Sequence, residues 1–183
     1  GEVRFVQGGY TGHLSNFGET LTLTDSGDVL VNQTTTPENP SDAQRYLVIS
    51  EIMYHPADPA PDAEFMELMN ISDTVTLDLT GVKFSAGIDY AFPNGTMLAP
   101  GARIVVNFAD FQNASRLNNG SDRIKLEDAS NSTIQDFSYN DTLPWPTAAD
   151  GGGPSLVLID PRSAPDHALA SNWRSSVAAG GNP

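Results

Sequence analysis

Short extended segments separated by turns occupy most of the chain between residues 47 and 160. Leu47 to Tyr54 is a mostly apolar, β-branched run, and Glu64 to Met69 alternates apolar with polar side chains before Asn70. Such short runs, bounded by Gly, Pro, Asn and Asp, are typical of β-strands and the turns between them. A chain with many short strands of this kind favours an all-β sandwich or barrel over a sheet connected by crossover helices.

The same pattern predicts further strands along the chain. Val75, Leu77 and Leu79 alternate with polar residues before Gly81, which predicts a half-buried strand. No window shows a helical period. The remaining predicted strands lie at residues 82–84, 90–92, 104–108, 123–126, 134–139 and 156–159.

Charge and residue usage narrow the classes of function. Nine Lys and Arg stand against 23 Asp and Glu, so the formal net charge is −14. This charge disfavours nucleic acids and anionic membrane surfaces, because binding to both depends on cationic side chains. The chain has no Cys, which excludes disulfides and thiolate zinc sites. No apolar run approaches the roughly 20 residues of a membrane-spanning helix, which predicts no membrane insertion.

The N-terminal segment repeats part of the later sequence at a constant offset of 103 residues. Similarity at a domain-sized spacing predicts a duplicated module, so residues 1–33 are interpreted as a β-hairpin from the end of an upstream copy. The alternative is a hairpin added to this domain. Leu21, Leu23, Val29 and Val31 are its apolar side chains, and we expect it to pack on the main sandwich or on a neighbouring chain. The matched residues are Leu14, Asn16, Glu19, Leu21, Leu23 and Asp25 with Leu117, Asn119, Asp122, Ile124, Leu126 and Asp128.

Composition also predicts the domain boundaries. Residues 34–46 are polar, Thr-rich and contain Pro37 and Pro40, which is typical of a stiff linker. Residues 47–175 then form the main sandwich. The Gly-rich residues 176–183 are predicted to be a C-terminal linker.

Several segments, taken in order, resemble the lamin-tail domain family, in particular the version found in large exported bacterial proteins. The resemblance covers most of residues 47–175 and implies an immunoglobulin-like β-sandwich with no established enzymatic activity. Eukaryotic lamin tails are associated with chromatin, and the acidic charge argues against that role here. The segments are Ile49 to Pro56, Glu64 to Asn70, Leu77 to Gly81, Phe92 to Thr96, Leu98 to Gly101, Leu117 to Gly120, Leu126 to Asp128, Trp145-Pro146 and Asp150 to Asp160, with a late Asn172-Trp173.

One acidic loop is a candidate metal site. Asp58, Asp62 and Glu64 follow the first strand in a Pro-rich segment, and clustered oxygen ligands are what Ca²⁺ requires. Their spacing is not that of an EF-hand. The alternative is a solvated turn, so no cofactor is expected other than this candidate calcium.

No arrangement of residues predicts catalysis. Glu51, Glu64 and Glu67 could be imagined as a glycosidase pair, but that chemistry needs two carboxyls held across a cleft. His13, His55 and His167 fall in turns or loops, and no Ser occupies a nucleophile elbow. We therefore expect a protein that is not an enzyme.

Three aromatic residues are the candidate ligand-binding residues. Tyr139, Trp145 and Trp173 lie near polar neighbours in the sequence, and aromatic faces beside polar groups often bind carbohydrates or peptides. The alternative is that these side chains fill the core or close one end of the sandwich.

These observations favour a non-enzymatic module of a larger exported bacterial protein, secreted or on the cell surface. Its expected work is protein–protein or cell-surface contact, including surface glycans, or the spacing of neighbouring domains. One alternative is a carbohydrate-binding module that accompanies a polysaccharide-degrading enzyme. The other is a calcium-stabilised adhesin.

Overall fold

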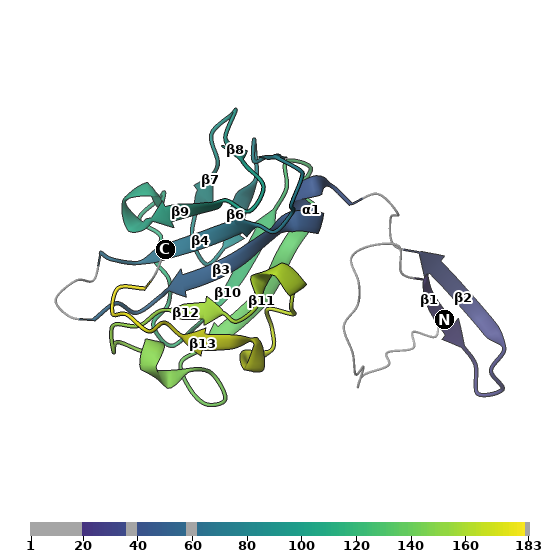
Figure 1. The fold of residues 1–183 in the computed structure, drawn as a ribbon. Coiled ribbons are helices and arrows are strands. Elements are labelled where there is room, and N and C mark those ends of the chain that lie inside the picture. Colours follow the sequence, from purple (N-terminus) through teal and green to yellow (C-terminus); the bar gives the residue numbers. More distant parts are fainter. Residues whose placement is uncertain (1–19, 36–39, 58–61, 182–183) are drawn as a thin grey trace. The chain divides into compact units, whose positions relative to one another are not determined.

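The structure is a computed structural model that describes residues 20–35, 40–57 and 62–181 of the chain. It divides into two compact units, residues 1–40 and 41–183. Each unit is described by itself, and Figure 1 labels their elements.

The larger unit contains a five-stranded antiparallel sheet with β3 at its centre (Figure 1). Both faces of β3 are buried along its whole length. A central strand buried on both faces means that both faces of the sheet are covered there. In spatial order, the strands are β13 (Trp173–Ser175), β12 (Leu156–Leu158), β3 (Leu47–Met53), β4 (Phe65–Asn70) and β9 (Arg103–Asn107).

A four-stranded antiparallel sheet contributes the other half of the core. Its longest strands, β10 and β11, pair over seven residues of β10. The strand order is β11 (Thr133–Asn140), β10 (Ser121–Glu127), β6 (Lys83–Ala86) and β7 (Tyr90–Ala91). The short pair β5 (Leu77–Asp78) and β8 (Met97–Leu98) and the 3₁₀ turns η1 (Phe108–Asp110), η2 (Thr147–Ala149), η3 (Pro161–Ser163) and η4 (Ala170–Asn172) complete the unit.

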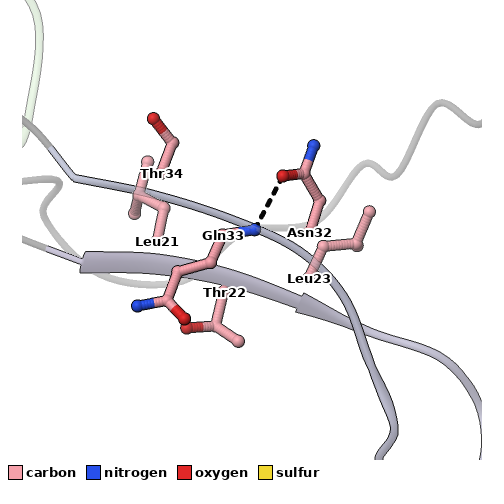
Figure 2. Close-up of a pocket in the computed structure, with 6 residues that line it drawn as sticks. All are labelled: Leu21, Thr22, Leu23, Asn32, Gln33 and Thr34. Atoms are coloured by element: carbon pink, nitrogen blue, oxygen red, sulfur yellow. Dashed lines mark hydrogen bonds between the residues drawn. The ribbon is translucent and has the colours of Figure 1, made fainter.

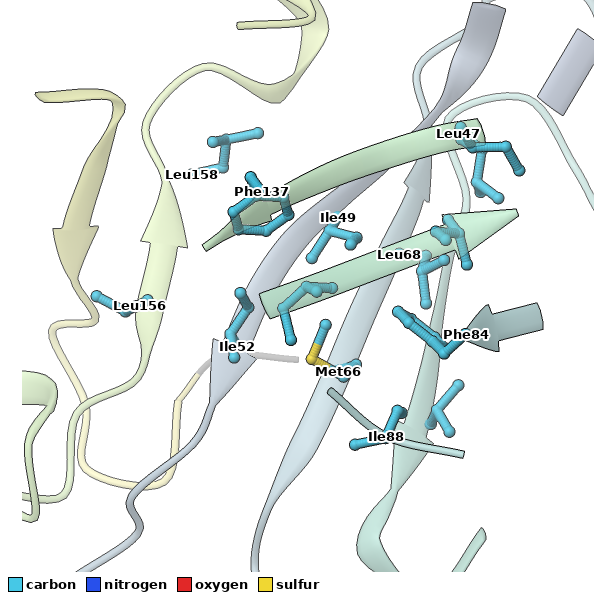
Figure 3. Close-up of a cluster of buried hydrophobic side chains, with 14 of the residues drawn as sticks. Leu47, Ile49, Ile52, Met66, Leu68, Phe84, Ile88, Phe137, Leu156 and Leu158 are labelled. Carbon is cyan, nitrogen blue, oxygen red and sulfur yellow. The ribbon is translucent and has the colours of Figure 1, made fainter. Parts of the chain in front are cut away.

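Apolar side chains from both sheets form one buried cluster. Figure 3 shows Ile49, Ile52 and Met66 from the five-stranded sheet close to Phe84 and Phe137 from the four-stranded sheet. Burial of one such side chain stabilises the fold by roughly 1.5–3 kcal/mol. Hydrophobic packing between the two layers therefore holds the sandwich together, and the prediction of an all-β sandwich is confirmed.

The predicted strands are present, with ends that differ by at most two residues, but shorter elements were missed. Residues 75–79 form only the two-residue strand β5, and neither β8 nor β13 was predicted. These elements contain two or three residues each. Alternation cannot be recognised over so few positions.

A one-turn helix, α1 (Asp42–Tyr46), lies in the segment that the composition assigned to a linker. The Ser41 hydroxyl accepts a hydrogen bond from the Gln44 backbone N–H at 3.2 Å, and Gln44 Oε1 accepts one from the Ser41 N–H at 2.9 Å. This is a capping box, which satisfies two backbone donors that a helix start leaves unpaired. Five residues are too short to show a helical period.

The outer face of the five-stranded sheet is covered as well. Val48 and Met53 of β3 and Phe65 and Met69 of β4 are buried but lie outside the main apolar cluster. Part of the cover is the C-terminal segment, residues 176–181, which the sequence assigned to a linker. Its backbone donates hydrogen bonds to the segment before β12, from Ser176 to Ser155 at 2.9 Å and from Gly180 to Gly153 at 2.8 Å.

The smaller unit is described over a two-stranded hairpin, β1 (Thr20–Thr24) and β2 (Leu30–Thr35). Leu23, Val29, Leu30 and Val31 are more than half exposed. The expectation that this hairpin packs on a partner stays a prediction. None of the helices within the described ranges is long and apolar enough to cross a membrane.

Candidate functional site

Two glutamates lie opposite each other at the centre of the outer face of the five-stranded sheet. Glu51 of β3 is the register partner of Glu67 of β4, and each is only 2% exposed. Directly opposite like charges destabilise a sheet, and buried charges cost free energy unless they are bonded. Alternation with Met66 and Leu68 points Glu67 away from the main core, and the irregularity between Ile49 and Glu51 turns Glu51 to the same outer face. Alternation does not predict that the two side chains are buried.

Glu67 is held from two sides. The Ser50 hydroxyl donates to Glu67 Oε1 at 2.6 Å, and Arg103 Nε lies 3.0 Å from the same oxygen. Oε2 is buried and has no hydrogen-bond partner within the described residues. Burial raises the pKa of Glu67 above its ordinary value, while Ser50 and Arg103 partly oppose this shift. Glu67 is therefore a carboxyl whose charge is only partly compensated.

Glu51 is bonded to the segment before β12 and lies under the C-terminal segment. The buried Ser155 hydroxyl donates to Glu51 Oε1. This hydrogen bond connects β3 to the residue that precedes β12. Gly181 has φ +78°, and a Cβ there would collide with Glu51 Oε1 and with Phe65. The glycine lets the chain pass directly over the carboxylate.

The candidate calcium loop is bonded to an arginine. Asp62 Oδ1 lies 2.6 Å from Arg116 Nη2, and Glu64 accepts from the Leu117 N–H at 2.9 Å and from Arg116 Nη1 at 3.4 Å. The Arg116 guanidinium also lies 4.1 Å from the centre of the Phe108 ring. Burial raises the pKa of Glu64 against the lowering effect of these donors. Both described carboxylates of the loop therefore already have a cationic partner.

Asp58, the third candidate calcium ligand, lies outside the described residues. Over the ranges that the structure describes, no three His, Asp or Glu side chains group so that they could hold a metal ion. Calcium binding by Asp58, Asp62 and Glu64 stays a prediction.

A second polar cluster lies where β3 ends. His55 Nδ1 is 2.6 Å from Asp150 Oδ1, and the Gly151 N–H donates to the His55 carbonyl at 3.1 Å. The neighbouring Tyr54 is fully buried, with its ring centre 4.6 Å from that of Tyr139. Burial, assisted by the charge of Asp150, raises the pKa of the Tyr54 phenol. Tyr54 is thus a neutral packing residue at physiological pH.

The three candidate ligand-binding aromatics are all buried members of the main core. Tyr139 donates its hydroxyl hydrogen to the Asn118 carbonyl at 2.6 Å, and Trp173 Nε1 donates to the His167 carbonyl at 2.9 Å. The structure brings Trp145 and Trp173 together, with ring centres 6.2 Å apart. Burial of all three side chains is what the alternative requires, in which they fill the core of the sandwich. Their role in ligand binding stays a prediction.

Sequence reasoning missed the contacts around Glu51, Glu67 and His167. Ser155 and Glu51 are 104 residues apart, and His167 bonds to Ile49 across 118 residues. No local pattern marks such pairs. The only available signal is a polar residue next to an apolar run, which is too common to be informative.

The antiparallel sheets, packed on one apolar core, place the larger unit among the immunoglobulin-like β-sandwich domains. Residues 40–141 match the family model of the Lamin Tail Domain, which is more than half of the chain. The chain therefore belongs to the lamin tail domain family, as its sequence motifs indicated. No curated protein and no solved structure matches it.

The matched region begins just before α1 and ends after β11. Strands β12 and β13 and the C-terminal segment lie beyond it. The family assignment thus covers the four-stranded sheet, β3, β4 and β9, while Ser155 and Gly181 belong to additional chain. The Glu51–Ser155 contact joins the family module to this addition.

Proposed function

We propose that residues 41–181 form a non-catalytic module that spaces neighbouring domains of a larger exported bacterial polypeptide and forms protein–protein contacts. The observation that carries the proposal is how the chemically capable side chains are used. Glu51, Glu64 and Glu67 bond within the sandwich, and Trp145 and Trp173 pack in its core. A module with this construction offers other molecules a stable, acidic exterior.

The charge supports proteins as the partners. A formal net charge of −14 repels phosphate backbones and anionic surfaces and favours contacts with neutral or cationic protein surfaces. The exported, secreted or cell-surface location rests on the resemblance to lamin-tail modules of exported bacterial proteins.

A retention assay tests this function against its rivals. The purified chain is passed over soluble and insoluble polysaccharides and over the immobilised neighbouring domains of its native polypeptide. We expect retention only on the protein matrices and no turnover of chromogenic esters or glycosides. Retention on a polysaccharide, lost in Trp145→Ala but not in the exposed-site variant Leu143→Ala, would instead favour the carbohydrate-binding alternative.

A length measurement tests spacing separately. Deletion of residues 41–181 from the native polypeptide should shorten its maximum dimension in small-angle X-ray scattering. Replacement by an unrelated immunoglobulin-like domain of similar size should restore that dimension. An unchanged dimension after the deletion contradicts a spacing role.

A further inference from the structure

The hairpin β1–β2 has the same strand register as the β10–β11 hairpin of the sandwich. Both are antiparallel, and residues that pair in one hairpin pair in the other when each number is increased by 103. A register is fixed by the turn and the hydrophobic pattern, so shared register is structural and not only compositional similarity. Equivalent pairs are Leu21–Thr34 with Ile124–Phe137 and Leu23–Asn32 with Leu126–Gln135.

An irregularity of the ladder recurs at the same position. The register shifts between Leu23 and Thr24 in the first hairpin and between Leu126 and Glu127 in the second. A β-bulge is a specific local feature that simple turn composition does not impose. Its recurrence at the same offset argues against two unrelated hairpins.

The turns also match bond for bond. Asp25 Oδ1 accepts from the N–H groups of Gly27 and Val29 at 2.8 and 3.0 Å. Asp128 Oδ1 accepts from the equivalent Ser130 and Ser132 at 2.9 and 3.0 Å.

Positive φ falls on the same turn position in both hairpins, at Asp28 and at Asn131. Asp and Asn adopt this conformation more readily than most residues with a side chain.

The two hairpins differ in what covers them. Leu126 and the bulge residue Ile134 are 0% and 3% exposed, whereas the equivalent Leu23 and Val31 are 56% and 60% exposed. Figure 2 shows Leu21 and Leu23 lining one shallow hollow of the first hairpin. In the sandwich, β10 pairs with β6 on the side away from β11, and side chains of the five-stranded sheet pack in the same core.

The spacing of the two hairpins, 103 residues, is within one residue of the length of the family match. The family match spans residues 40–141. The position 103 residues before its last residue is residue 38. A first module ending there would be followed at once by the second. This is the arrangement of tandem repeats.

We propose that the exposed apolar face of the β1–β2 hairpin docks on the preceding part of the same polypeptide. That part is a lamin-tail half-sandwich equivalent to residues 41–118, and together the two pieces form an upstream tandem module. In the second module, the other strands of the family match, β3 to β9, all precede the β10–β11 hairpin in the chain. This upstream module is a neighbouring domain of the kind that the proposed spacing function requires. Hydrogen exchange can detect the docking whether or not the module acts as a spacer.

The hairpin is a poor substitute for β10–β11 in the core of a sandwich with this sequence, whether in the same chain or in a second copy. Thr34 is the residue equivalent to Phe137. The ring centre of Phe137 lies 5.9 Å from that of Trp173 and 5.1 Å from that of His167. A hairpin that replaced β10–β11 would leave this space unfilled, and large-to-small changes in a core are strongly destabilising. The partner core must therefore be filled differently at that position.

Hydrogen exchange of the β1–β2 amides tests the proposal. It is measured in the 183-residue chain and in the native polypeptide extended by the module that precedes Gly1. We expect these amides to exchange at least about 100-fold more slowly in the extended chain, because docked strands open only through unfolding of their module. The amides of β3 serve as an internal reference in both.

Substitutions at two neighbouring positions provide a test variant and its matched control. Leu23→Lys places a charge on the apolar face and should abolish the protection. Thr22→Lys places the same charge on the opposite face, next to Gln33 (Figure 2), where the second module already carries Lys125. This variant should keep the protection.

Other outcomes overturn the proposal. They are a native polypeptide without a preceding module, or β1–β2 amides that stay fast in the extended chain while β3 stays protected. Concentration-dependent protection in the 183-residue chain, with a dimer in sedimentation, would assign the face to a second copy instead.

Discussion

His167 is buried between aromatic rings, with ring centres 5.1 Å from Phe137 and 5.7 Å from Trp173. Its Nε2–H donates to the Ile49 carbonyl at 3.0 Å. Burial lowers the pKa of His167 to about 4, because the core cannot solvate an imidazolium. Backbone hydrogen bonds at Ile49 and Pro165 and the charge of Asp166 oppose this shift only in part. At neutral pH His167 is thus an uncharged structural residue.

The stability of the sandwich should therefore fall as the pH falls from about 6.5 to 4. In this window the unfolded chain takes up a proton at His167 and the folded chain does not. The loss reaches up to about 3 kcal/mol. Urea unfolding at pH 7, 6 and 5 measures it, and the difference between the wild type and His167→Gln isolates this group. An imidazole that titrates near pH 6.5 in the folded protein contradicts the assignment.

Protonation of Glu67 should change the folding stability in the opposite direction to protonation of His167. Its pKa is raised in the folded chain, so the folded state binds the proton first and protonation stabilises it as the pH falls. The wild type should gain stability relative to Glu67→Gln between pH 7 and 5, measured by urea unfolding. Glu127→Gln is the control: the Lys125 hydrogen bond lowers the pKa of Glu127, so its contribution is lost only at more acidic pH, and the difference between the wild type and this variant should stay nearly constant between pH 7 and 5. Parallel pH profiles for the two variants contradict this interpretation.

At the scale of elements, the sequence predicted the long strands and missed what covers them. Apolar runs and alternation bounded by turn residues located β3, β4, β10 and β11, because each spans six to eight residues with a buried face. It did not predict the burial of Glu51 and Glu67. Their cover includes residues 176–181, an irregular segment without periodicity.

The repeat at offset 103 was the most productive signal in the sequence. Six matched positions predicted a duplicated hairpin, and the structure adds the same bulge and the same Asp-centred turn. The aromatic cluster was less accessible to sequence reasoning. Trp145 lies in an irregular segment and Trp173 begins the three-residue strand β13, so composition could not distinguish a ligand platform from a core.

Phe137 of β11 should be one of the residues that contribute most to the stability of the sandwich. Its ring stacks on Trp173 and contacts His167, so one side chain joins the four-stranded sheet to the β13 region. Phe137→Ala should lower the free energy of unfolding by about 3–5 kcal/mol. The next residue, Ser138, is exposed, and Ser138→Ala should change it by no more than about 0.5 kcal/mol. Equal urea midpoints for both variants contradict this role.

At the scale of the whole molecule, the acidic charge dominates. A net charge of −14 makes the folded chain repel itself, and salt screens that repulsion over a Debye length of about 10 Å at 0.1 M. The surface pairs Arg123–Asp136 and Arg162–Asp73 are weakened by the same salt, but exposed pairs contribute little. Net repulsion therefore decides the sign of the salt effect.

The melting temperature should rise by a few degrees, about 2–5 °C, between 10 and 500 mM NaCl. CaCl₂ and MgCl₂ at matched ionic strength should give the same rise, since Asp62 and Glu64 are already bonded to Arg116. Calorimetric scans in the three salts separate screening from binding. A specific site would respond to Ca²⁺ alone and stabilise the fold by RT ln(1 + [Ca²⁺]/Kd), and this extra rise would disappear in Asp62→Asn. Such a result would mean that Ca²⁺ displaces the Arg116 guanidinium from its carboxylates, and the acidic loop would then be the calcium site that its sequence suggests.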